Sequence, residues 1–235
     1  MRQEYLDEYF TFLRFPSIST DDAYNENVSE CAHWLVKKLT DIGLETKLVS
    51  TKGHPIVWAK NKHQPGRRTV LLYGHYDVQP PDPLDLWDSP PFDPVLKNGF
   101  VFPRAPTDNK GQIMAHILGI QETMAEKGDL PVNLNLIIEG EEEIGSGNLP
   151  GFLQENHDSL VCDVAVVSDT GMVARGVPTL SYGLRGVTAL EIKSPGATMD
   201  LPARVFGGSF ATRTPPLAPF PATLTPQTAH EALRR

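Results

Sequence analysis

The sequence predicts an α/β protein whose central sheet is mostly parallel and doubly wound. Two observations support this. Short apolar and β-branched segments alternate along the chain with helical ones, as they do in strand–helix–strand units. Several predicted strands also end directly in His, Asp or Glu, and open α/β sheets bind ligands at the carboxyl ends of their strands. With 235 residues, the chain is long enough for one large domain, or for one domain and part of another.

Apolar residues at three- and four-residue spacing predict three helices, and a shorter fourth one follows them. Their ranges are 3–14, 28–42, 113–124 and 149–156. The first helix is expected to end at Phe15-Pro16 and the second at Gly43. The polar stretch 21–27 between these two helices is expected to be a loop.

Strands are predicted where short apolar segments are bounded by turn residues. They cover 45–50, 55–60, 69–73, 133–138 and 163–167. The segment 81–107 has no clear periodicity, and loops of this length in compact domains are usually functional or disordered. Its aromatic residues favour an ordered loop near a site. They are Trp87, Phe92, Phe100 and Phe102.

The charge and the cysteines exclude several classes of partner and location. A formal net charge of −8 argues against nucleic acid or an anionic membrane as the main partner, and it suits a site that gathers cations. No apolar run is long enough to span a bilayer, and the acidic, amphipathic first residues do not resemble a signal peptide. Cys31 and Cys162 lie in apolar patterns, so we expect buried free thiols and a cytoplasmic location.

The central predicted strand leads into the stretch 74–80, Gly-His-Tyr-Asp-Val-Gln-Pro. Its His75 and Asp77 are two residues apart, so on extended backbone their side chains point to the same side. A histidine at a strand end can bind a metal ion, and a neighbouring carboxylate can orient its ring. Taken alone, the better interpretation of His75 is a strand-end histidine that is merely hydrogen-bonded.

Further carboxylates follow at the ends of other predicted elements. Asp108 precedes a predicted helix, and its simpler interpretation is an N-cap. Glu142 and Glu143 belong to an acidic run after a strand, and such a run is ordinarily a solvated turn. Asp169 follows the last predicted strand.

These positions together predict a metal site. Because the strand ends of such a sheet meet at one rim, we expect His75 and the carboxylates to converge there. One histidine with several carboxylates suits a divalent ion such as zinc, manganese or cobalt. The sequence has no phosphate loop, Gly-rich dinucleotide turn or Gly-x-Ser-x-Gly elbow that would favour another chemistry.

With these residues assembled, the chain resembles the M20 family of metallopeptidases. Four stretches carry the resemblance in the family's order: 74–80, 106–111 (Pro-Thr-Asp-Asn-Lys-Gly), 139–146 (Glu-Gly-Glu-Glu-Glu-Ile-Gly-Ser) and 168–169 (Ser-Asp). The resemblance covers roughly Tyr5 to Gly208. It implies a zinc-peptidase-like α/β catalytic domain, here 1–180, with an inserted α+β lid domain that begins at 181–208.

The resemblance also implies a site with two divalent metal ions, zinc or manganese, as cofactors. The ligands would be His75, Asp108, Glu143 and Asp169. His75 and Asp169 would bind one ion, Glu143 would bind the other, and Asp108 would bridge both. Asp77 would orient the histidine ring, and Glu142 would be the general base. A cis peptide bond is expected after Asp108.

By this resemblance, the protein is expected to hydrolyse the peptide bond of dipeptides or small peptides. A deacylase of N-acyl amino acids from the same family is the alternative among enzymes, and a non-catalytic metal-binding fragment is the alternative outside them. The expected partner is a small peptide substrate, with no nucleic acid and no membrane. Full-length relatives are expected to be homodimers through the lid domain.

The chain departs from the family's pattern toward its C-terminal end. In the dipeptidase-like pattern a lid histidine stands where this chain has Pro202. After Gly208 the resemblance stops, and the Pro-rich tail 209–235 is expected to be disordered. The family's last metal histidine has no match there, because the context of His230 differs from that motif. We therefore expect a truncated chain with an incomplete second metal site and impaired activity.

Overall fold

The structure, a computed structural model, describes residues 2–184 and 186. Internal contacts divide the chain into two units, Met1–Ser181 and Tyr182–Arg235. Nearly all of the described residues belong to the first unit, which contains every helix and strand named below.

Several predictions fall on residues that the structure does not describe. They concern the lid segment 181–208, of which only 181–184 and 186 are described, the replacement of the lid histidine by Pro202, and the tail 209–235. What the sequence predicts about the domain boundaries, the lid and the tail therefore stays a prediction.

The helices and strands follow the predicted order. The helices are α1 (Gln3–Leu13), η1 (Asp22–Tyr24), α2 (Asn25–Asp41), η2 (Leu84–Leu86), α3 (Lys110–Lys127), η3 (Glu142–Ile144), α4 (Leu149–Glu155) and α5 (His157–Leu160). The strands are β1 (Glu45–Val49), β2 (Ile56–Lys60), β3 (Thr69–His75), β4 (Val95–Lys97), β5 (Phe100–Phe102), β6 (Asn133–Glu139) and β7 (Val164–Val167). None of the helices in the described part of the chain is long and apolar enough to cross a membrane.

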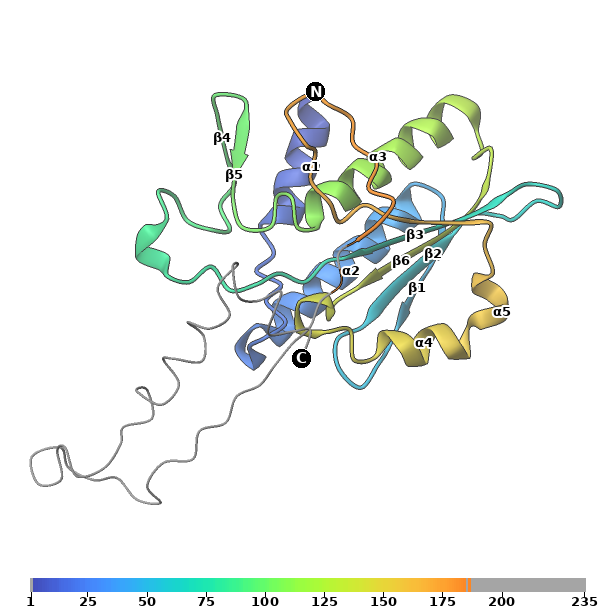
Figure 1. Cartoon of the computed structure of the whole chain (residues 1–235), viewed down its shortest axis with the longest axis horizontal. Coiled ribbons are helices and arrows are strands. Elements are labelled where there is room, and N and C mark those ends of the chain that lie inside the picture. Colours follow the sequence, from blue (N-terminus) through green and yellow to red (C-terminus); the bar gives the residue numbers. More distant parts are fainter. Residues whose placement is uncertain (1, 185, 187–235) are drawn as a thin grey trace, which may run out of the picture. The chain divides into compact units, whose positions relative to one another are not determined.

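A five-stranded sheet of order β1-β2-β6-β3-β7 forms the centre of the fold (Figure 1). β3 pairs in parallel with both β6 and β7, whereas β2 pairs antiparallel with β6 and with β1. The prediction of a mostly parallel sheet was therefore wrong for the β1–β2 side. Only the short turn 50–55 joins these two strands, and a parallel connection needs a crossover of a dozen residues or more.

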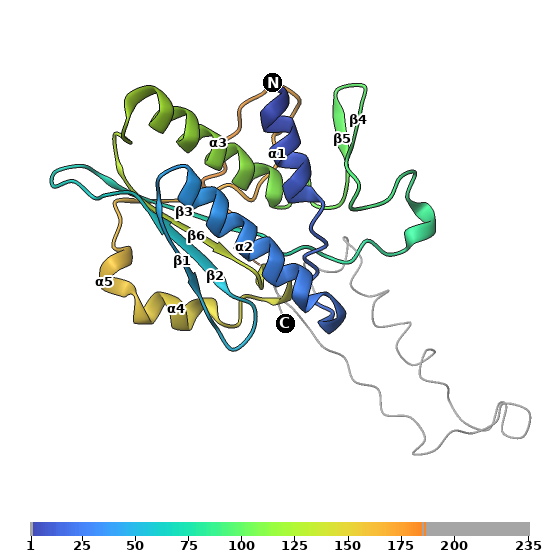
Figure 2. The same cartoon turned by 180° about the vertical axis from the view of Figure 1, so that it is seen from behind.

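Helices cover both faces of this sheet, as a doubly wound arrangement requires (Figures 1 and 2). The larger core lies between the sheet and the helices α1, α2 and α3, where side chains such as Phe12, Leu35 and Ile117 are fully buried. The smaller core lies on the opposite face, where Phe152 of α4 and Leu160 of α5 pack.

Two predicted loops contain regular structure. The stretch 21–27 holds η1 and the first turn of α2, which begins at Asn25. The segment 81–107 contains η2 and an antiparallel hairpin of β4 and β5. The overlooked signal was Asn98-Gly99, because both residues have positive φ and this pair favours two-residue hairpin turns.

Two of the aromatics that were expected near a site belong to this hairpin. Phe100 and Phe102 are half exposed on β5, which stands apart from the five-stranded sheet (Figures 1 and 2). Phe92 instead packs beside a small cluster of Ile18, Val78 and Ala105. As predicted, both cysteines are free, Cys31 being buried and Cys162 only partly buried.

The start of α3 is fastened to the end of α1 by a buried lysine. Lys110 is fully buried, and its Nζ donates hydrogen bonds to the carbonyls of Phe12 (3.2 Å) and Phe15 (2.7 Å). Tyr9 of α1 adds a hydrogen bond of 2.7 Å from its hydroxyl to the Pro106 carbonyl. The segment that precedes α3 is thereby held against the larger core.

Gly74 of β3 lies directly under this segment, and we predict that its replacement by Ala destabilises the fold. An added Cβ would lie 2.6 Å from Asn109 Oδ1 and 2.8 Å from Ile113 Cγ1, and both of those side chains are buried. Overpacking of this kind costs about 1–3 kcal/mol of unfolding free energy. The measurement is urea unfolding of the full chain.

Gly119→Ala is the matched control, since a Cβ at this exposed position of α3 meets no heavy atom within 4 Å. There the change should stabilise the helix by up to about 1 kcal/mol. Equal unfolding free energies for the two variants would contradict the packing that we describe.

Candidate metal centre

The sheet register brings the predicted residues to one rim. His75 is the last residue of β3 and pairs with Glu139, the last residue of β6. Val167 ends β7 opposite Tyr73, so Asp169 follows at the level of His75. Glu142 and Glu143, which follow β6, and Asp108, which precedes α3, complete the rim.

His75 Nε2 is the point where the carboxylates meet. It lies 3.1 Å from Asp108 Oδ1, 3.5 Å from Asp169 Oδ2 and 3.9 Å from Glu142 Oε2. The imidazole is completely buried, whereas the Asp108 side chain is 61% exposed. The rim is therefore open on the carboxylate side and closed behind the histidine.

Asp77 lies behind the histidine ring and is also completely buried. Its Oδ1 is 3.3 Å from His75 Nδ1, and the Asp77 carbonyl oxygen is 3.1 Å from the same nitrogen. The Asp77 carboxylate also accepts hydrogen bonds from the backbone N–H groups of Glu142 (3.2 Å) and Glu143 (3.1 Å) and from the Ser19 hydroxyl (2.7 Å). One side chain thus holds the histidine and the acidic pair together.

The donor set fits divalent cations. Two groups of three residues, each with one ligand atom within 4.8 Å of the others, share His75; they are His75–Glu142–Asp169 and His75–Asp108–Glu143. An imidazole with several carboxylates is the set that zinc or manganese binds. All the predicted ligands therefore converge. The grouping differs in one point: Asp169 is grouped with His75 and Glu142, whereas the resemblance implied that Asp169 shares an ion with His75 and Asp108.

The simpler interpretations of Asp108 and of the acidic run after β6 do not match the structure. The N-cap of α3 is Asn109, so Asp108 is not its cap. The acidic run is not a solvated turn throughout, because Glu141 is buried and accepts hydrogen bonds from the N–H groups of His54 (3.0 Å) and Asn148 (3.2 Å). The expected cis peptide bond joins Asp108 to Asn109.

The electrostatics of the rim follow from burial and like charges. Burial lowers the pKa of His75, but the hydrogen bond and charge of Asp77, together with the charges of Glu142 and Asp169, raise it to about 9. Burial raises the pKa values of Glu142 and Glu143, and each is raised further by a neighbouring carboxylate. Without a cation, the rim therefore binds protons more readily than free side chains do.

Three residues around the rim were not predicted as site residues. Gln79 donates a hydrogen bond of 2.8 Å from its Nε2 to Glu143 Oε2, and the Asn109 side chain accepts one of 3.3 Å from the His75 backbone N–H. The third is Ser19, which binds Asp77. Gln79 could have been found, because it follows His75 and Asp77 at the same two-residue spacing.

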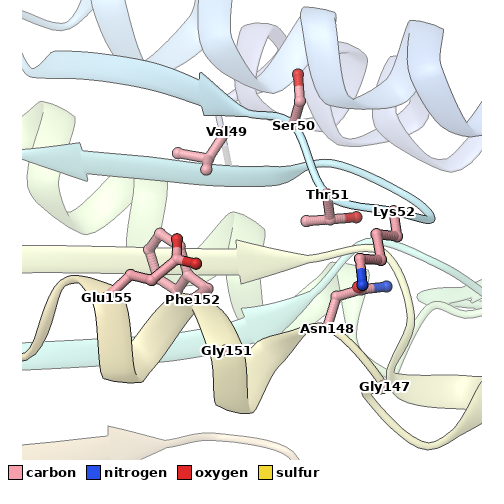
Figure 3. A pocket seen from close by; sticks show the side chains of 9 residues that line it. All are labelled: Val49, Ser50, Thr51, Lys52, Gly147, Asn148, Gly151, Phe152 and Glu155. Atoms are coloured by element: carbon pink, nitrogen blue, oxygen red, sulfur yellow. The ribbon is translucent and has the colours of Figure 1, made fainter.

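A separate shallow cleft lies between the β1–β2 turn and α4 (Figure 3). Its volume is about 420 Å³, and the side chains of Lys52, Asn148, Phe152 and Glu155 line parts of it. None of the six predicted site residues lines this cleft.

Comparison with known proteins identifies the family. The family model for peptidase family M20/M25/M40 matches residues 71–219, which include all six predicted site residues. The chain belongs to this family. Its four M20 motif stretches are the ones that form the rim.

Among curated M20 relatives, the Cys-Gly metallodipeptidase dug1 of Schizosaccharomyces pombe is 34% identical over 86% of this chain and 46% of its own length. The human Beta-Ala-His dipeptidase is 35% identical over 66% of this chain and 31% of its own length. The solved structure of the di-peptidase Dug1p from Saccharomyces cerevisiae is similar, with a TM-score of 0.81 and 27% identity, over 94% of this chain and 50% of that one. The chain thus spans half or less of the length of these relatives.

The raised pKa of His75 predicts that metal uptake releases a proton. At pH 7 the metal-free imidazole is protonated, since its pKa is about 9, and a metal ion needs the neutral ring. We expect release of about one proton per chain at pH 7 and an apparent affinity that rises with pH up to about 9. Titration calorimetry with Zn²⁺ in buffers of different ionisation enthalpy measures this.

The unfolding free energy of the metal-free protein should show the opposite dependence on pH, because it falls where the metal affinity rises. The stabilisation from protonated His75 is complete below its unfolded value of 6.5 and is lost as pH rises through about 9. His157→Ala, an exposed histidine, is the control for both measurements. Zinc uptake at pH 7 without proton release would contradict the raised pKa.

Proposed function

We propose that this chain carries the catalytic domain of a metal-dependent dipeptidase, which hydrolyses the peptide bond of dipeptides or small peptides. The observation that carries the proposal is the convergence of four carboxylates on the His75 imidazole in two overlapping three-residue groups. Membership of the M20 family and the names of its dipeptidase relatives support it.

In this proposal His75, Asp108, Glu143 and Asp169 are the residues that would hold the divalent ions. When bound, the ions would acidify a water molecule and polarise the carbonyl of the bond to be cut. The remaining work belongs to side chains of this chain. Asp77 holds the histidine ring from Nδ1, so that Nε2 faces the carboxylates.

Glu142 is proposed as the general base. It would take a proton from the attacking water and give one to the amine nitrogen of the broken peptide bond, so that one water molecule is consumed for each bond cut. Burial and the charges of Glu143 and Asp169 raise its pKa, which makes the carboxylate a better proton acceptor. The hydrogen bond that the Glu142 backbone N–H donates to the Asp77 carboxylate fixes its position.

Glu143 is given a different role because its side chain is held differently. Gln79 Nε2 donates to both Glu143 Oε2 and the Glu143 carbonyl oxygen, at 2.8 and 3.1 Å. The remaining carboxylate oxygen can bind an ion. Since Glu142 also lies within one of the two ligand groups, the two roles need an experiment that separates them.

The proposed roles predict different losses on substitution. Glu142→Gln should lower turnover by about 10²–10⁴-fold and leave bound metal unchanged, because the amide cannot accept the proton. Glu143→Gln should lose metal as well, since an amide is a weaker ligand. Elemental analysis of dialysed protein and peptide hydrolysis give the two readouts, and Glu126→Gln, at an exposed position of α3, is the control.

Equal metal loss in Glu142→Gln and Glu143→Gln would contradict this division of roles. A dimer through the lid, and the impaired activity expected from Pro202 and the tail, rest on residues outside the described ones and stay predictions.

The substrate class is tested on the full chain with Mn²⁺ or Zn²⁺ added. A panel of dipeptides, including Cys-Gly and β-Ala-His, is compared with N-acyl amino acids. We expect hydrolysis of dipeptides and no release of acyl groups. Preferential cleavage of N-acyl amino acids would make the protein a deacylase, and metal uptake without any turnover would make it a non-catalytic metal-binding chain.

A further inference from the structure

We infer that His116 is a positioning residue for the metal centre, which fixes Asp169 through a hydrogen bond to Ser168. This inference rests on the proposed function, because it needs Asp169 to be a metal ligand. His116 matches none of the M20 motifs in the sequence and lies on α3, well beyond the stretch 106–111.

The geometry links His116 to the rim in three steps. His116 Nε2 lies 2.7 Å from Ser168 Oγ, within hydrogen-bond distance. Ser168 is the residue between the end of β7 at Val167 and Asp169. Asp169 Oδ2 in turn lies 3.5 Å from His75 Nε2. The hydrogen bond therefore acts on the backbone unit directly before the ligand.

Asp169 needs this support more than the other proposed ligands do. His75 belongs to a central strand with partners on both sides, and Asp77 binds the backbone N–H groups of Glu142 and Glu143. β7, in contrast, is the last strand in the order and, among the residues that the structure describes, pairs with β3 alone. Its Val164 and Val167 are 46% and 56% exposed, so its own side chains fasten it weakly.

α3 is a rigid base for the hydrogen bond. The residues around His116 on this helix, Ile113, Met114 and Ile117, are buried in the larger core. The buried ammonium of Lys110 fixes the start of the helix against α1. Because Asp108 lies two residues before the start of α3, one helix would set the positions of two ligands, Asp108 before its first turn and Asp169 by way of His116.

Burial lowers the pKa of His116, so its imidazole is neutral at pH 7. A neutral ring nitrogen can accept the Ser168 hydroxyl proton or donate to the hydroxyl oxygen. Gln is therefore a suitable replacement, because its uncharged terminal amide can occupy the place of Nε2 and make the same hydrogen bond.

The test compares four variants of the full chain: His116→Ala, His116→Gln, Ser168→Ala and the control His157→Ala. Zn²⁺ binding is measured by titration calorimetry, and the unfolding free energy is measured in parallel. Loss of a residue that orients a metal ligand typically lowers affinity by about 10–100-fold. We expect a loss of this size at one site in His116→Ala and Ser168→Ala, and affinity within a few-fold of the unmodified chain in His116→Gln and His157→Ala.

Two outcomes overturn the inference. Normal Zn²⁺ affinity in both His116→Ala and Ser168→Ala would show that the hydrogen bond does not position a ligand. A loss in His116→Ala that His116→Gln fails to restore, with normal binding in Ser168→Ala, would assign His116 to packing. If His116→Ala does not fold, Ser168→Ala decides the question, because it removes a single oxygen atom.

Failure of the proposed function gives a different result. In that case the unmodified chain either takes up no Zn²⁺, and His75→Ala changes nothing, or it takes up Zn²⁺ and hydrolyses no dipeptide. Zn²⁺ uptake that His75→Ala abolishes and that neither His116→Ala nor Ser168→Ala weakens, together with dipeptide hydrolysis by the unmodified chain, would uphold the proposed function and overturn only the role of His116.

Discussion

The carboxylate of Asp77 is the interaction on which the rim of this M20 domain depends. It is fully buried, and a buried charge costs several kcal/mol unless it is paired and hydrogen-bonded. Here it meets the imidazole of His75, two backbone N–H groups of the acidic pair and the Ser19 hydroxyl. These groups come from three segments far apart in the sequence. Satisfying one charge therefore assembles the site, and no segment can shift without removing a partner of that charge.

The same arrangement explains how the carboxylate-rich rim can exist in the folded protein before a cation binds. Asp77 and the rim carboxylates raise the pKa of His75 to about 9, so at neutral pH a proton supplies the positive charge at the meeting point. Burial also raises the pKa values of Glu142 and Glu143. Proton and cation then compete for one nitrogen, which couples metal affinity to pH.

The sequence was sufficient for features that depend on local pattern. The spacing of His75 and Asp77 predicted that both lie on one side of the strand end, and the alternation of strands and helices predicted the rim. The antiparallel β1–β2 pair and the Asn98-Gly99 hairpin were also readable from short connections, but they were not recognised. The partners in contacts between distant positions left no local signal, although the spacing of Gln79 after His75 and Asp77 pointed to the rim. Gln79–Glu143, Ser19–Asp77 and His116–Ser168 join residues 64, 58 and 52 positions apart.

The proposed ligands differ in the contacts that fix their positions. This difference determines how strongly a substitution nearby should disturb each of them. His75 stands on a central strand between two neighbours, and the acidic pair is fixed by a buried charge. Asp108 precedes a helix whose first residue is buried in the larger core. Asp169 follows β7, which within the described part of the chain has a ladder on one side only and carries exposed side chains, so its position depends more on the hydrogen bond between His116 and Ser168. A rim built in this way is stiff at its centre and adjustable at the β7 edge, where a substitution can change a ligand without unfolding the sheet.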